Sequence, residues 1–517
     1  VAGRITVVLG VPLGLTAGLG WIAVLVGSSR HDAGQGLAPV ALATLGALAT
    51  LHLDLHANPT HPGALRDSVI VVALGAAVLT MPRPVQRTVA TAIGAMAFVG
   101  GLLRGATDAP PPRGPAPDAP DLILVVVDAW RADHLGRQAP HPTGLTPVTP
   151  GLDTLLPAGR RWSSAVTPAP WTLPAFASLL TGERPAEHRA GLPGFEGRPR
   201  PLGTAGAAIA QRLHAAGYHT AGIVSNPWLF PAWGVSRGFA HWDARLGWPR
   251  RPALLHPLDV AGYDLFVDRY ARPASAMVEA AEHWWDDHID RPRFLLLHLM
   301  DPHGPWPPVH GPDPETADRR AYAAEVRRMD RALAPRLAQW IAEGATVILT
   351  SDHGERLARR PDGGIPTHRH GAALRPAVVQ VPLVVWSPDV VPGVDDTPVS
   401  TREVADTLLR AAGQPTASTG RDLRGPVPDD RAVVTEAPRV GPWRQRLQSG
   451  DAVWIVGPGV DRVTRGGRPV SGPAADAVRA ALGGLRHDPT TAAAPSGPVI
   501  ARQALEALGY VDGDTGR

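Results

Sequence analysis

Two apolar runs in this chain each end in a carboxylate, and this pattern constrains the fold more than any other feature. Leu122–Val127 (LILVVV) is followed by Asp128, and residues 345–350 (ATVILT) are followed by the tripeptide 351–353 (SDH). Short continuous apolar runs are typical of strands that are buried on both faces of a parallel sheet. Ligand sites of open α/β sheets lie at the carboxyl ends of the strands. The pattern therefore predicts an α/β domain with a metal site at that edge.

Strand-like and helix-like segments alternate after residue 121. Buried strands are predicted at 220–224, 294–299 and 346–349, and helices at 205–216, 275–285 and 321–343. Such alternation indicates an α/β fold with a central, mostly parallel sheet. After about residue 425 the pattern changes to short segments separated by glycine turns, which predicts a small antiparallel subdomain with late helices near 474–482 and 500–508.

The first hundred residues differ from the rest of the chain. Residues 5–27 carry no charge and are long enough to span a bilayer, which needs about 20 apolar residues. Further apolar segments follow at 37–53, 68–81 and 88–103. A cleaved signal peptide has only one short apolar core, so repeated segments argue against one.

We therefore expect a transmembrane region of about four spans over residues 1–106 and a Pro-rich linker over 107–120. This predicts a multi-pass membrane protein in contact with the lipid bilayer. Arginines flank the spans equally on both sides, so the positive-inside rule gives no orientation, and a catalytic domain outside the cytoplasm is an expectation. The alternative is that the apolar segments are helices buried in a soluble domain.

Composition excludes several classes of function. The formal net charge is only +3, and no dense basic patch is interleaved with aromatic residues, so we do not expect nucleic acid as a partner. All 50 cationic residues are arginine, which excludes lysine-dependent chemistry. Cysteine is absent, which excludes disulfides, thiolate nucleophiles and thiolate metal sites.

Further residues that can carry chemistry lie near the ends of predicted elements. Thr172 opens a helix-like run that ends at 181–182, and Asn226 follows the strand at 220–224. Asp301 and His303 follow the strand at 294–299, and His370 lies in a polar loop. Each has a structural reading, as a helix cap, a turn residue or a solvated histidine. Because most of these residues follow apolar strands, we interpret them together as one site.

Together these segments resemble the sulfatase family of the alkaline-phosphatase superfamily. The resemblance rests on 121–136 (DLILVVVDAWRADHLG), on 149–182 with its "TPGLD" start, on "DPHGP" at 301–305 and on "TSDHGE" at 350–355. It implies an alkaline-phosphatase-like sandwich, with a catalytic domain over 121–425 and a C-terminal subdomain over 426–517.

The chain departs from the family pattern at the nucleophile and at the metal. Sulfatases carry Cys or Ser, converted to formylglycine, in a C/S-x-P-x-R pattern, whereas this chain has Thr172 and lacks the arginine. It therefore resembles the threonine branch, which includes phosphodiesterases and phosphonate hydrolases. Ala129 replaces the second Asp of calcium sulfatases, and His353 stands where many sulfatases have Asn. Since imidazole suits Zn²⁺ or Mn²⁺ better than Ca²⁺, we expect Zn, Mn or Mg.

The resemblance also implies roles for the site residues. Asp128, Asp352, His353 and Thr172 would hold a divalent metal ion, and Thr172 would be the nucleophile. Asn226 would help to hold the peripheral oxygens of the substrate.

Two histidines have alternative roles under the same resemblance. Either His303 or His370 protonates the leaving oxygen. Alternatively, Asp301, His303 and His370 bind a second ion, so that the site holds one or two metals.

Three functions remain open from the sequence. The leading hypothesis is a membrane-anchored hydrolase that cleaves phosphate or sulfate esters, on substrates linked to lipid or glycan. The second is an envelope phosphoglycerol- or phosphoethanolamine-type transferase. The third is a non-catalytic sulfatase-like binding module, which we disfavour because Asp128, Asp352 and His353 are all present.

Overall fold

A computed structural model describes most of the chain after residue 118. The residues described are 119–136, 148–193, 199–204, 208–245, 271–306, 309, 313–357, 370–416, 418–428, 431–436, 439 and 443–486. The expected membrane spans in 1–106, most of the linker and the expected helix at 500–508 lie outside these residues. Within the described part of the chain, none of the helices is both long and apolar enough to cross a membrane.

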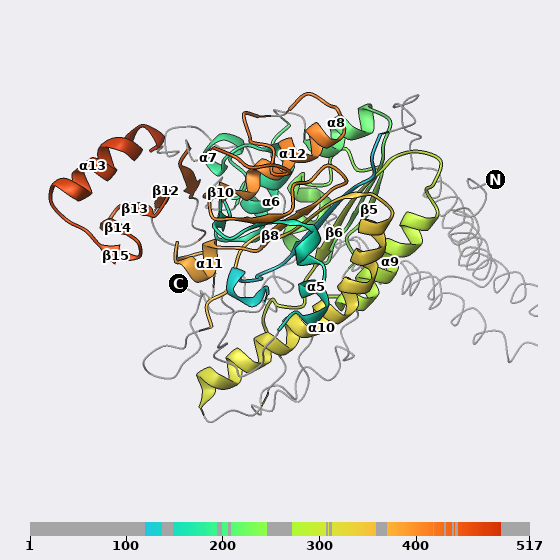
Figure 1. The fold of residues 1–517 in the computed structure, drawn as a ribbon, viewed down its shortest axis with the longest axis horizontal. Helices are drawn as coiled ribbons and strands as arrows, with labels where there is room; N and C mark the ends of the chain where they lie inside the picture. Colours follow the sequence, from blue (N-terminus) through green and yellow to red (C-terminus); the bar gives the residue numbers. More distant parts are fainter. Residues whose placement is uncertain are drawn as a thin grey trace, which may run out of the picture. The chain divides into compact units, whose positions relative to one another are not determined.

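The centre of the described part is a mixed, mostly parallel sheet (Figure 1). Its strands lie in the order β5 (His241–Asp243), β4 (His219–Ile223), β6 (Arg293–Leu299), β1 (Leu122–Val127), β7 (Thr346–Ser351), β8 (Leu383–Trp386), β2 (Arg160–Trp162) and β9 (Gly393–Asp395). The pairs from β5 to β7 are parallel, whereas β8 runs antiparallel to both β7 and β2. The predicted buried strands at 220–224, 294–299 and 346–349 correspond to β4, β6 and β7.

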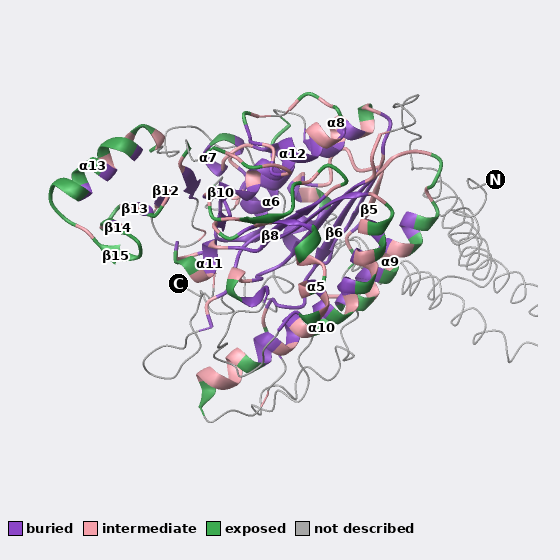
Figure 2. Cartoon of the chain, in the orientation of Figure 1, coloured by how far each residue is buried: buried purple, intermediate pink, exposed green. Residues whose placement is uncertain are grey.

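Helices cover both faces of this sheet, which explains why its strands read as continuous apolar runs (Figures 1 and 2). One face carries α6 (Thr172–Thr181), α8 (Ile209–Ala215) and α12 (Val404–Ala411), and the other carries α5 (Pro150–Asp153), α9 (Ala274–Asp286) and α10 (Pro314–Ala342). Along β1, Leu122, Leu124 and Val126 pack toward α6, while Ile123, Val125 and Val127 pack toward α10.

Two predicted helices differ from the observed ones mainly at their starts. The predicted helix at 321–343 begins earlier, at Pro314, because the Asp313 side chain accepts a hydrogen bond from Thr316 N (2.9 Å) and caps the first turn. The predicted helix at 205–216 begins at Ile209. Short elements complete this part: β3 (Ala165–Val166), β10 (Val399–Ser400), α7 (Pro185–His188) and α11 (Pro376–Val379).

A small antiparallel sheet follows, as predicted. It is built from β11 (Val433–Thr435), β12 (Gln445–Ser449), β13 (Ala452–Gly457), β14 (Val460–Arg465) and β15 (Arg468–Pro469), and α13 (Pro473–Leu482) packs on it. Two hydrogen bonds join β11 to the loop before α6. The Thr435 hydroxyl donates to Thr167 O (2.7 Å), and Glu436 N donates to Pro168 O (2.9 Å).

Candidate active site

The register of three neighbouring strands brings the predicted ligands together. Val127 of β1 lies beside Ser351 of β7, so Asp128 and Asp352 leave the sheet side by side. Side chains two residues apart along a strand share a face. Because Val126 faces α6, Asp128 faces α6 as well, and so does His298, which is in register with Val126.

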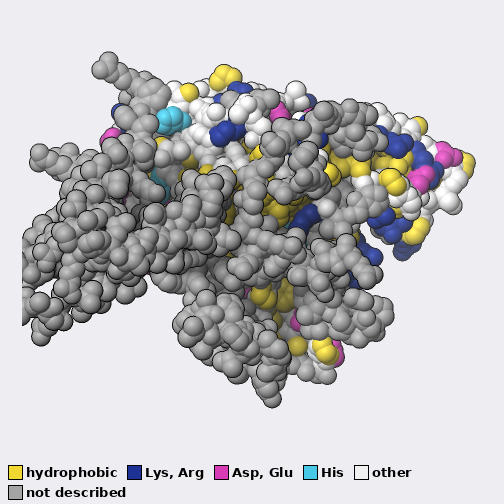
Figure 3. Space-filling model, turned by 180° about the vertical axis from the view of Figure 1, so that it is seen from behind, with side chains coloured by type: hydrophobic (Ala, Val, Ile, Leu, Met, Phe, Trp, Pro, Cys, Tyr) yellow, Lys and Arg dark blue, Asp and Glu magenta, His cyan; other side chains and the backbone are white. Residues whose placement is uncertain are grey.

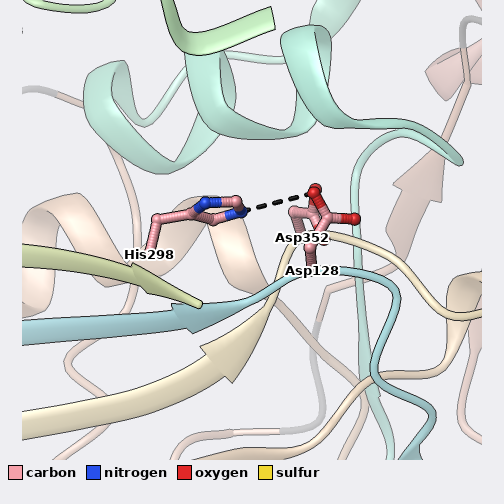
Figure 4. Close-up of side chains that lie close together, drawn as sticks. All are labelled: Asp128, His298 and Asp352. Carbon is pink, nitrogen blue, oxygen red and sulfur yellow. Dashed lines mark ion pairs between the residues drawn. The ribbon is translucent and has the colours of Figure 1, made fainter. Parts of the chain in front are cut away.

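Asp128, His298 and Asp352 form a buried cluster at this edge (Figure 4). All three are 0 % exposed, and one ligand atom from each lies within 4.8 Å of the others. His298 Nε2 lies 3.3 Å from Asp128 Oδ2. His298 was not identified from the sequence, although a histidine inside the apolar run of β6 was the signal that could have found it.

The buried polar atoms of this cluster fit a divalent cation. Asp128 Oδ1, Asp352 Oδ2 and both ring nitrogens of His298 have no hydrogen-bond partner. Burial, together with the neighbouring Asp128 carboxylate, raises the pKa of Asp352 well above its usual value. Burial alone would also raise the pKa of Asp128, but His303, His298 and His353 lower it. Two adjacent buried carboxylates need a counter-charge, and the set of oxygen and imidazole ligands suits Zn²⁺ or Mn²⁺.

His353 connects this cluster to the predicted nucleophile. Its Nδ1 lies 2.9 Å from Gly354 O, which can only accept, so Nδ1 carries the proton and Nε2 of the neutral ring carries a lone pair. Nε2 lies 3.6 Å from Asp128 Oδ1, 3.5 Å from Asp352 Oδ2 and 3.4 Å from Thr172 Oγ1. His353 can thus ligate a cation between the carboxylates or accept a proton from Thr172.

Thr172 is the first residue of α6, and Trp171 occupies the N-cap position. The first N–H groups of a helix have no partner within the helix and carry a partial positive charge. The whole of α6 is buried, and Thr172 itself is 0 % exposed. The structure therefore brings the Thr172 hydroxyl, a helix N-terminus and the carboxylate cluster to one place.

Asn226 holds Asp128 in position. Its Nδ2 donates to Asp128 Oδ2 (2.6 Å), and its Oδ1 accepts from Trp228 N (2.9 Å). The amide is therefore fixed at both ends, and its orientation follows from these two bonds. The predicted contact between Asn226 and substrate oxygens stays a prediction.

His370 and His303 lie next to His353. The His370 ring stacks on the His353 ring with 4.3 Å between centroids, and the His303 ring meets His370 edge-on at 5.1 Å. His370 Nδ1 also lies 3.2 Å from Oε1 of Glu355, a buried residue that the sequence analysis did not single out. Burial lowers the pKa of His303 to about 4 despite the nearby Asp128 carboxylate.

Asp301 is hydrogen-bonded to the start of α9. Its Oδ2 accepts a hydrogen bond from Ala274 N (2.8 Å), at the first residue of α9. It is not a member of the cluster of Asp128, His298 and Asp352. Its predicted role as a metal ligand remains untested.

Hydrogen bonds join the loops after β1 and β7, which fixes the predicted ligands Asp128 and Asp352. Ala129 N donates to Asp352 Oδ1 (3.2 Å), and Trp130 N donates to Ser351 Oγ (3.0 Å). Ala129 has φ 57°, which is uncommon for a residue with a Cβ. At Gly354 a Cβ would lie 2.2 Å from Ala377 O, so only glycine fits there.

The described part of the chain is an α/β protein with a mostly parallel sheet. Buried carboxylates and an imidazole at the carboxyl edge of this sheet lie near a hydroxyl at a helix N-terminus, which defines a candidate metal-dependent site. The profile of the sulfatase family matches residues 120–414, which is more than half of the chain. The chain therefore belongs to the sulfatase family, whose members are ester hydrolases.

Solved structures share this fold at low sequence identity. A phosphonate monoester hydrolase from Silicibacter pomeroyi is 19% identical, with a TM-score of 0.51 over 71% of this chain and 95% of that chain. The phosphonate monoester hydrolase of Agrobacterium radiobacter is 17% identical, with a TM-score of 0.52 over 70% and 93%. BT4656, solved in complex with its substrate D-glucosamine-2-N,6-O-disulfate, is 14% identical, with a TM-score of 0.53 over 77% and 100%. At these identities the likeness shows the fold alone.

Proposed function

We propose that this protein hydrolyses phosphoric esters with Thr172 as the nucleophile and a divalent metal ion as cofactor. One observation carries the proposal: Thr172 Oγ1 lies 3.4 Å from His353 Nε2, which in turn lies within 3.6 Å of oxygens of both Asp128 and Asp352. A nucleophile beside a group that can take its proton is the arrangement that activates a hydroxyl.

Asp128, His298 and Asp352 would hold the ion, which leaves His353 Nε2 to take the proton of Thr172. When bound, a cation of this kind supplies Lewis-acid polarisation of the ester and lowers the pKa of a neighbouring hydroxyl. The residues of the chain position the reactants. Asn226 orients Asp128, and the N-terminus of α6 faces the negative charge of the substrate.

The reaction proceeds in two balanced steps. The Thr172 oxygen forms a bond to phosphorus and passes its proton to His353 Nε2, while the bond from phosphorus to the leaving oxygen breaks. His370 protonates that oxygen, because the Glu355 carboxylate beside Nδ1 stabilises the imidazolium form. The oxygen of a water molecule then bonds to phosphorus as the bond from phosphorus to the Thr172 oxygen breaks. His353 returns its proton to Thr172, and His370 takes the proton of the water.

Phosphoesters are favoured over sulfate esters because threonine cannot become formylglycine. Without a geminal hydroxyl, a sulfo-enzyme would have to be broken by direct attack on sulfur. The fold is shared both with phosphonate monoester hydrolases and with BT4656, whose substrate is sulfated, so the choice rests on Thr172.

The test is turnover of matched aryl phosphodiester, phosphonate monoester, phosphomonoester and sulfate substrates by the metal-loaded protein. We expect the phosphoesters to be cleaved fastest and Thr172→Ala to lower kcat by at least ~1,000-fold, while Thr172→Ser keeps part of the activity. Near-normal turnover by Thr172→Ala would assign the nucleophile elsewhere. Preferred cleavage of aryl sulfate would contradict the proposed substrate. If an added alcohol takes the phosphoryl group from Thr172 in place of water, the protein is a transferase.

We also propose that residues 1–106 anchor the protein in a membrane, with the catalytic domain outside the cytoplasm. Their successive apolar segments support this proposal. Full-length protein should require detergent for extraction, whereas a chain lacking residues 1–106 should not. Extraction of the full chain by buffer alone would contradict the anchor.

A further inference from the structure

Arg439, which lies beyond the family match in the segment between β11 and β12, contacts the surroundings of the nucleophile. Its guanidinium carbon lies 5.9 Å from the ring centroid of Trp171 and 5.5 Å from that of Trp228. Trp171 directly precedes Thr172, and Trp228 N is bonded to Asn226, which holds Asp128. Arg439 thus contacts the neighbours of two site residues, Thr172 and Asn226.

The backbone places Arg439 next to a third site residue. Arg439 N donates to Gly371 O (2.6 Å), and Gly371 N donates to Pro170 O (2.8 Å). Gly371 follows His370, and a Cβ at Gly371 would lie 3.3 Å from the Cβ of Arg439 and 3.7 Å from that of Trp171. The segment containing Arg439 is therefore bonded to the His370 loop, and that loop is bonded to the residues before α6.

The two tryptophans form a fixed platform for the guanidinium. Their rings meet edge-on with 5.2 Å between centroids, and the side chains are 0 % and 3 % exposed. A cation over such faces is attracted by the ring quadrupoles. A guanidinium has its donors in its own plane, in the fork that matches a carboxylate or phosphate. Arg439 itself is only partly buried.

We infer that Arg439 determines substrate specificity by binding a second anionic group of the substrate, beside the ester that reacts at Thr172. This rests on the proposed function. The substrate class is then an ester whose leaving part carries its own negative charge, such as a carboxylate or a further phosphate. The competing interpretation is that Arg439 only joins the C-terminal sheet to the two tryptophans.

A binding experiment separates these interpretations without any turnover. Benzylphosphonate and 4-carboxybenzylphosphonate contain no ester bond and differ by one carboxylate. Their Kd values are measured by titration calorimetry on the metal-loaded full chain. We expect the wild-type protein to bind the carboxylated ligand about 10-fold more tightly, since one charge-assisted pair contributes roughly that factor.

Arg439→Gln should reduce this preference to about 1-fold, and Arg439→Lys should keep part of it, because the charge remains but the fork is lost. Arg465→Gln is the matched control, since Arg465 lies in β14, with a side chain 58 % exposed. Arg439→Met keeps the apolar stem over the rings, so it separates loss of packing from loss of charge.

The inference is wrong if the wild-type protein shows no preference, or if Arg439→Gln and Arg439→Met both keep it. It is also wrong if Arg439→Gln weakens both ligands equally, because Arg439 would then hold the reacting group. Failure of the proposed function gives a different result: the ligand preference is present and depends on Arg439, while the aryl esters are not cleaved.

Discussion

At the scale of single residues, the site depends on polar side chains that are buried with unsatisfied atoms. Asp128, His298 and Asp352 are fully buried, and each has at least one side-chain oxygen or nitrogen without a hydrogen-bond partner. An unpaired buried polar atom costs stability, so such a cluster persists only where something else is gained. A bound cation would supply that gain, which makes His298 the most informative residue to change.

We predict that His298→Gln weakens metal binding by at least ~10-fold, because the imidazole ligand of the cluster is lost. Metal content after dialysis against a defined free concentration, measured by mass spectrometry, gives the occupancy. His219→Gln is the control, since His219 pairs with Asp290 (2.9 Å) at the start of β4, away from the cluster. Unchanged occupancy in His298→Gln would remove this residue from the ligand set.

A second buried histidine should make stability depend on pH. His188 Nε2 lies 2.9 Å from Ser178 Oγ, and its Nδ1 accepts from Ala190 N (3.0 Å). Burial lowers the pKa of His188 to about 3. The unfolded chain therefore binds a proton that the folded chain does not bind between about pH 6.5 and pH 3, and stability falls as the pH falls through that window.

Between pH 7.5 and pH 5, this group should contribute a loss of about 2 kcal/mol in the free energy of unfolding. Denaturant unfolding at both pH values gives the loss of stability on acidification for the wild-type protein and for His188→Gln. The difference between the two losses is the contribution of His188. The variant should lose less stability on acidification. An equal loss in both proteins would mean that His188 is protonated in the folded state.

At the scale of elements, β12 carries a charge that its surroundings do not compensate. Arg446 is 3 % exposed, its Nη1 has no hydrogen-bond partner, and its register neighbours are Thr435 and Ile455. Burial lowers the pKa of Arg446 to about 10, so the side chain remains charged at neutral pH. By contrast, Arg462 and Arg465 on β14, which pairs with β13, are exposed. Figure 3 shows dark blue side chains gathered on the surface of the C-terminal part.

We predict that Arg446→Met raises the free energy of unfolding by about 1–2 kcal/mol, since an apolar side chain of similar length replaces an uncompensated buried charge. The control is Arg462→Met on β14, which pairs with Ile455 and is exposed, and should change stability by less than about 0.5 kcal/mol. Thermal and denaturant unfolding give both values. A less stable Arg446→Met protein would indicate that the guanidinium has a stabilising partner.

At the scale of the whole molecule, the proposed ion would link three strands. Asp128, His298 and Asp352 follow or belong to β1, β6 and β7, which are the centre of the sheet. Binding to the folded state alone stabilises it by mass action. The ion would therefore act on the stability of the entire sheet as well as on its edge.

We predict that chelation lowers the melting temperature and that Zn²⁺ or Mn²⁺ restores it. At a free metal concentration about 100 times Kd, the stabilisation is about 2.7 kcal/mol. Asp352→Asn, which removes one carboxylate, should melt at nearly the same temperature with and without metal. A melting temperature of the wild-type protein that does not respond to chelator would contradict a structural contribution of the ion.

Much of the fold could be predicted from local pattern. The apolar runs at β1, β6 and β7 indicated buried strands, because strands covered on both faces are apolar at every position. The segments after 425, separated by glycines, indicated the antiparallel sheet. The start of α10 was placed too late, since the polar first turns carry no apolar pattern and depend on the Asp313 cap. The pairing order of the strands was not predictable, because it joins segments that are far apart in the chain.

The sequence by itself determined the residue types at the strand ends and the absence of cysteine and lysine. It also placed a threonine, Thr172, at the position that the resemblance assigns to the nucleophile. These properties belong to the covalent chain and limit the chemistry before folding. Only the tertiary structure decided that His298 joins Asp128 and Asp352, and that Arg439 lies over Trp171. The physical reason is that strand register and the packing of the C-terminal sheet set these neighbours, and both depend on contacts between distant parts of the chain.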